Sequence, residues 1–228
     1  MARIESTTTQ SLHRSTLWTL PALAAVAVLL AAALTLWAGA PRWDAVALGA
    51  GGWLAALVLR GPIAAVVAKL PRERATTIIG AASGPCEEIV RLLLVLLLVS
   101  GFPEVLWAGY GWAAIEIVYT MVSALFIRSL LGKTDEKSLE ARRLLEAQGM
   151  LRPDGPLWAV LERISVSLLH IGFTLLLAWQ PWLLLATVPL HSAVNLLVVR
   201  LARVSLPKAE ALIAVVSAAV FAFGLLCH

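Results

Sequence analysis

The chain has 228 residues, of which 60% are hydrophobic and only 14% are charged, and its net charge is +4. A soluble domain has about a quarter charged residues, so this composition excludes an ordinary soluble fold and predicts an integral membrane protein. The basic residues gather at the ends of apolar segments instead of forming a stripe, which argues against a nucleic-acid partner. Two cysteines, Cys86 and Cys227, are too few for a disulfide framework or a cysteine-based zinc site.

Apolar segments long enough to cross a bilayer, about 20 residues each, follow one another along the chain. The first is too long for the core of a signal peptide, so we expect a retained span and no cleavable signal. The second contains Arg60-Gly61-Pro62, where we expect a kink or a break, and a different interpretation of that break gives six or eight spans. We predict an all-α, polytopic membrane helix bundle of about seven transmembrane helices, forming a single domain over residues 1–228. The expected spans are 17–38, 43–69, 76–100, 105–131, 157–179, 181–204 and 206–227.

Lysine and arginine predict the orientation, because cytoplasmic loops carry an excess of them. With the N-terminus in the cytoplasm, nearly all basic residues outside the spans fall on the cytoplasmic side, and Arg42 is the exception. This predicts an N-in, C-out topology, in what we expect to be a bacterial cytoplasmic (inner) membrane. The longest polar stretch, 132–156, has leucines on one side and is expected to be a cytoplasmic amphipathic connector, either a plain linker or a docking element.

Ionisable and amide side chains interrupt four consecutive spans, where each charge costs about 2.5–3.5 kcal/mol. In GPCEEIVRLLL the acids stand three and four residues before the arginine and share one helical face with it. The other groups occur in GYGWAAIEIVYT, LERISVSLLHIG and PLHSAVN. Such groups persist when they face inward and meet one another, so we expect one shared polar site. Its expected members are Glu87, Glu88, Arg91, Glu116, His170, His191 and Asn195.

These residue types suit hydrolysis. His170 and His191, together with a carboxylate or Asn195, offer donors for a divalent metal such as zinc. A remaining glutamate would take a proton from water. The structural alternative is that the ion pair between Glu87 and Arg91 only packs the helices and that the histidines are hydrogen-bonded core residues.

The order Glu-Glu-x-x-Arg, a glutamate in the next span, a mid-helix histidine and His-x-x-x-Asn resembles the superfamily of intramembrane metalloproteases. That group contains the CAAX-prenyl proteases, the bacteriocin-processing enzymes and the PrsW and YhfC families. The spacing in EEIVR is closest to the PrsW and YhfC pattern, and the likeness covers about residues 85–200. Trp112 stands where YhfC-type proteins would place a histidine, which removes one potential ligand.

The resemblance implies a membrane-embedded peptidase that hydrolyses a membrane-associated protein or peptide from a cavity open to the cytoplasm. By this likeness Glu87 and Glu88 supply the catalytic carboxylate, Arg91 positions them, and Glu116 joins them. The same likeness gives His170, His191 and Asn195 the binding of a metal, with zinc the expected one, or the stabilisation of the oxyanion.

Other classes fit less well. His-Glu-x-x-His of zinc site-2 proteases and a pair of intramembrane aspartates are absent from the sequence, and GAASG at 80–84 is a near miss to the rhomboid serine elbow. A non-catalytic membrane scaffold of the same fold and a proton-coupled transporter remain as alternatives, because buried glutamates and histidines also serve those functions.

Overall fold

The computed structural model describes residues 2–147 and 155–228. Within these residues every regular element is helical. The long helices are α1 (Ala2–Ala38), α2 (Trp43–Val67), α3 (Arg72–Leu97), α4 (Phe102–Leu131), α6 (Pro156–Trp179), α7 (Leu184–Val204) and α8 (Leu206–Leu226), with a short 3-10 turn, η1 (Pro181–Leu183), before α7. The predicted polytopic helix bundle is confirmed.

Six helices of the described chain are long and apolar enough to cross a membrane, which marks the protein as an integral membrane protein. They are Trp18–Ala38, Trp43–Val67, Phe102–Leu131, Pro156–Trp179, Pro181–Val204 and Leu206–Leu226. The long helix outside this set is α3, which carries Glu87, Glu88 and Arg91 in its apolar part. The sequence predicts about seven spans, whereas six helices of the described chain are apolar enough to cross a membrane. The difference is the more polar helix α3.

Of the kink or break predicted in the second segment, the break is wrong, because α2 continues through Pro62 as one helix. A proline removes one backbone donor and one helical hydrogen bond, a loss that membrane helices tolerate when neighbouring groups compensate. The short helix α5 (Glu136–Ala147) lies inside the predicted connector 132–156, and residues 148–154 of that connector lie outside the described residues.

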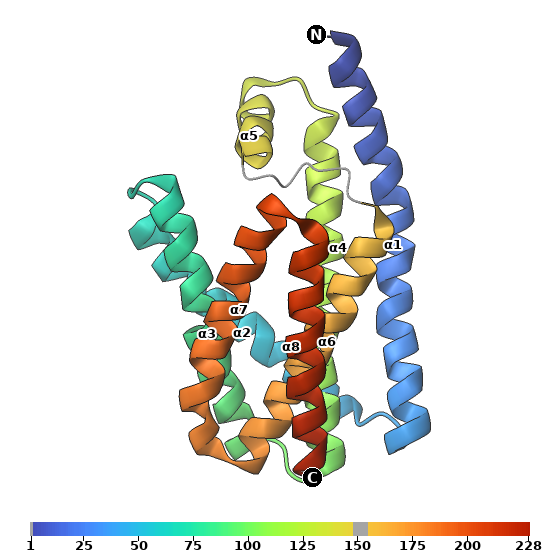
Figure 1. Cartoon of the computed structure of the whole chain (residues 1–228), viewed down its shortest axis with the longest axis vertical. Helices are drawn as coiled ribbons and strands as arrows, with labels where there is room; N and C mark the ends of the chain where they lie inside the picture. Colours follow the sequence, from blue (N-terminus) through green and yellow to red (C-terminus); the bar gives the residue numbers. More distant parts are fainter. Residues whose placement is uncertain (1, 148–154) are drawn as a thin grey trace.

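Six helices pack in a closed ring in the order α2, α3, α7, α8, α6 and α4, and α1 packs outside the ring against α4 and α6 (Figure 1). The two ends of the chain lie at opposite ends of the bundle, with α5 at the end of the N-terminus. Inside the ring α3 also contacts α6. The ring thus brings α3, α4, α6 and α7 around a common interior.

Two glycines allow the close helix approaches that this interior needs. A Cβ atom at Gly84 of α3 would collide with Ser192 and with the carbonyl of Val188 on α7. A Cβ atom at Gly109 of α4 would come within 2.9 Å of Ile171 on α6. Small residues at membrane helix interfaces let backbones approach closely. The helices that carry the expected site residues are therefore pressed together beside those residues.

Candidate functional site

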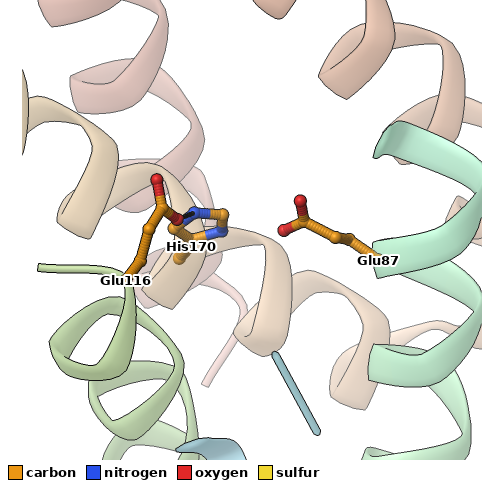
Figure 2. A group of neighbouring side chains, drawn as sticks. All are labelled: Glu87, Glu116 and His170. Atoms are coloured by element: carbon orange, nitrogen blue, oxygen red, sulfur yellow. Dashed lines mark hydrogen bonds and ion pairs between the residues drawn. The ribbon is translucent and has the colours of Figure 1, made fainter. Parts of the chain in front are cut away.

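The polar residues of α3, α4, α6 and α7 converge in the middle of the ring. Glu87, Glu88, Arg91, His170 and His191 are each at most 4% exposed. The ring centroids of the two imidazoles are 5.8 Å apart. Figure 2 shows the carboxylate of Glu87 pointing from α3 toward His170 and Glu116, and one donor atom from each of these three residues lies within 4.8 Å of the others.

Arg91 joins α3 to α6 at the centre of the site. Its Nε donates to Glu88 at 3.3 Å, and its Nη1 donates to the carbonyl oxygen of His170 at 3.0 Å and to Thr174 at 2.9 Å. Its Nη2 lies 2.9 Å from Nδ1 of His170, and the guanidinium stacks 4.1 Å from the ring of Trp112. Since every hydrogen-bonding nitrogen of this fully buried side chain has a partner, Arg91 holds the two helices in register.

The contacts of His170 define its tautomer. A guanidinium only donates, so Nδ1 of His170 accepts from Arg91 and Nε2 carries the hydrogen. That Nε2–H donates to Glu116 at 2.6 Å, and Arg163 donates to the other oxygen of Glu116 at 2.8 Å. Both nitrogens of this imidazole are therefore occupied.

His191 is arranged differently. Its Nδ1 donates to a carboxylate oxygen of Glu88 at 2.8 Å. Its Nε2 faces Glu87 at 3.8 Å, and the ring stacks on Phe173 at 5.7 Å. Glu88 thus orients His191 so that Nε2 of the ring lies toward Glu87.

A cavity of about 720 Å³ opens beside these groups. Glu87, Glu116, His170 and His191 line it, whereas Glu88 and Arg91 are fully buried behind it. It extends along α3 to Glu73 and along α7 to Arg203, at the end of the bundle where α5 lies. Its apolar wall includes Trp53, Leu57, Ile79, Val166, Leu196 and Ile213.

Asn195 lines the same cavity, but its amide donates to the hydroxyl of Ser83 at 2.7 Å. The group whose donor atoms cluster for a metal is instead Glu87, Glu116 and His170. Of the three expected ligands, His170 belongs to this cluster, while His191 and Asn195 lie beside it.

Two residues with contacts to Glu87 were not assigned to the site from the sequence. The indole N–H of Trp112 donates to Glu87 at 3.2 Å, and Nη2 of Arg60 lies 3.4 Å from the same carboxylate. Arg60 is a charge inside an apolar segment, and this is the signal in the sequence that points to it. Trp112 contributes a hydrogen-bond donor to this carboxylate.

Comparison with protein-family models, with curated proteins and with solved structures found no match.

Proposed function

We propose that the protein is an intramembrane endopeptidase in which Glu87 activates water for attack on a peptide bond. The observation that carries the proposal is the juxtaposition of a carboxylate and an imidazole at the cavity wall: Oε1 of Glu87 lies 3.8 Å from Nε2 of His191. A water in the cavity beside this pair can give a proton to the carboxylate of Glu87.

Glu87 has the position of a general base. It faces the cavity, and the indole of Trp112 holds its other oxygen at 3.2 Å. Glu88 is wholly buried and bonds to His191 and Arg91, so its part is to orient the imidazole. The glutamate takes a proton from water as the water oxygen attacks, and it returns that proton to the leaving amine.

The donor set also fits a metal, because two carboxylates and an imidazole are ligands that zinc accepts in catalytic sites. Glu87, Glu116 and His170 would hold it, with the contact between His170 and Glu116 giving way to coordination. Bound zinc would supply Lewis-acid polarisation of a carbonyl or of water. Metal analysis of the purified protein, alone and after chelation, measures whether zinc accompanies activity.

The substrate class follows from the cavity. A space of about 720 Å³ with an apolar wall inside a membrane bundle suits a short stretch of an extended, apolar peptide. The expected substrate is therefore a membrane-embedded protein or peptide that enters from the lipid bilayer or from the end of the bundle near α5.

For the topology we propose seven crossings, N-in and C-out, in a bacterial cytoplasmic membrane. α3 has the length to cross, and its charged residues are buried against α6 and α7 instead of facing lipid. In intact cells of a Cys86→Ala variant, a membrane-impermeant maleimide should label Cys227 from outside. Labelling that requires lysis would reverse the orientation.

The test of the activity uses the purified protein in liposomes with a library of synthetic single-span peptides. Hydrolysis in ¹⁸O-labelled water should place one ¹⁸O atom in the carboxylate of each new C-terminus, read by mass spectrometry. A folded protein that cleaves no peptide, with or without added zinc, would contradict the peptidase proposal and favour a scaffold. Proton flux into protein-containing liposomes without cleavage would favour a transporter.

A further inference from the structure

Three arginines inside the bundle differ in how firmly they are held. Arg91 is fully buried with partners on all of its nitrogens. Arg163 is held through both terminal nitrogens by two carboxylates, Glu116 at 2.8 Å and Glu162 at 2.6 Å. Arg60 has one ion pair, from Nη2 to Glu87 at 3.4 Å. The Nε atoms of Arg60 and Arg163 both lack an acceptor among the described residues, so the difference lies in the terminal nitrogens. Arg60 is therefore the least firmly held of these three arginines.

The position of Arg60 is also unlike that of a helix-end charge. It lies within α2, which runs from Trp43 to Val67, and its side chain is 20% exposed and lines the cavity. A charge inside a membrane bundle is costly and is retained where it has a task. The single contact to Glu87, at 3.4 Å, compensates little of the free-energy cost of burying this charge. A role in helix packing alone therefore does not explain why an arginine stands here.

Peptide hydrolysis needs a hydrogen-bond donor for the carbonyl oxygen that becomes an oxyanion. The donors expected from the sequence are otherwise engaged. The Nε2–H of His170 binds Glu116, the Nδ1–H of His191 binds Glu88, and the amide of Asn195 binds Ser83. Among the cavity-lining groups that contact Glu87, the guanidinium of Arg60 can turn free N–H groups toward a substrate.

We propose that Arg60 binds the carbonyl oxygen of the scissile peptide bond and stabilises the oxyanion, an inference that rests on the proposed peptidase function. A reacting carbon must lie about 3 Å from both the activated water and the oxyanion donors, and the 3.4 Å between Arg60 and Glu87 permits this. Water attacks the carbonyl carbon as its proton passes to Glu87, and the C=O pair moves onto the oxygen that faces Arg60. The C–N bond then breaks, the amine takes the proton from Glu87, and the carboxylic acid that remains releases its own proton to solvent to give a carboxylate.

The test measures kcat and KM separately on a peptide that the wild-type protein cleaves. Arg60→Gln should lower kcat about 100-fold or more with KM within about threefold, since the lost interaction forms in the transition state. Arg60→Lys keeps the charge beside Glu87 but loses the planar fork, so it should fold like the wild type and still lose at least about tenfold in kcat. Added guanidinium ion should restore part of the activity of Arg60→Ala.

The matched control is Arg128→Gln, which removes an arginine of α4 outside the cavity lining and should leave kcat unchanged. Thermal unfolding of each variant separates a folding defect from a catalytic one. An active wild type whose folded Arg60→Lys and Arg60→Gln variants keep full kcat, or change only KM, would overturn this inference alone. A wild type that cleaves nothing would overturn the proposed function and this inference with it.

Discussion

Replacing Glu87 by Gln is expected to lower the rate of peptide cleavage by about 100- to 10,000-fold, the range for loss of a general base. The amide keeps the shape of the side chain, and its oxygen can still accept from Trp112, which lies 3.2 Å away in the wild type. It cannot take a proton from water. The measurement is the initial rate of ¹⁸O-labelled product formation, with thermal unfolding to show that the variant is folded.

Two further variants sharpen this prediction. Glu136→Gln, in the first turn of α5, removes a carboxylate outside the cavity and should cleave like the wild type. Glu88→Gln should cost less than Glu87→Gln, because Glu88 acts on the reaction through the orientation of His191. Full activity of folded Glu87→Gln protein, together with loss of activity in Glu88→Gln, would move the base to Glu88.

Replacing Arg91 by Met is expected to reduce the free energy of unfolding by about 3–5 kcal/mol, the cost of leaving a buried charge unpaired. Arg91 is 0% exposed, and its loss would strip Glu88 of its cation and His170 of two hydrogen bonds, one to its carbonyl oxygen and one to Nδ1. The measurement is reversible unfolding in detergent micelles, followed by helical circular dichroism. Arg128→Met, outside the cavity, is the control and should change stability little.

The double variant Arg91→Met with Glu88→Leu removes both charges and should recover part of this loss, because an apolar pair in place of a buried ion pair is often neutral. Incomplete recovery is expected, since Nδ1 of His191 would lose its acceptor. Equal stability of Arg91→Met and the wild type would show that Arg91 does not hold α3 to α6.

The helices themselves were predictable because apolar length is a local property. Six of the seven predicted spans match a helix within a few residues at both ends, as with the predicted 157–179 and the observed Pro156–Trp179. The seventh, 17–38, lies within α1, which begins at Ala2. At Pro62, where the sequence predicted a kink or a break, α2 has no break. Local propensity at a proline is overridden when the helix is packed on both sides, here against α3 and α4.

The gathering of polar groups into one site also followed from the sequence, because bilayer-depth charges must meet each other. Their roles did not follow. Glu87 and Glu88 are adjacent, so the pattern EEIVR treats them alike, whereas the helix turn places Glu87 at the cavity and Glu88 behind it. The contacts of Arg60 and Trp112 with Glu87 join residues from three helices, and no sequence spacing encodes them.

The amino-acid sequence by itself determined that the chain is a bundle of membrane helices and that four of them carry polar groups at similar depth. Hydrophobic length and the cost of a charge in lipid are sufficient for both conclusions. Only the tertiary structure decided which carboxylate faces the cavity, which imidazole nitrogen lies toward Glu87 and which interior arginine is held least firmly. These depend on helix rotation and on distances of a few ångströms between segments far apart in the chain.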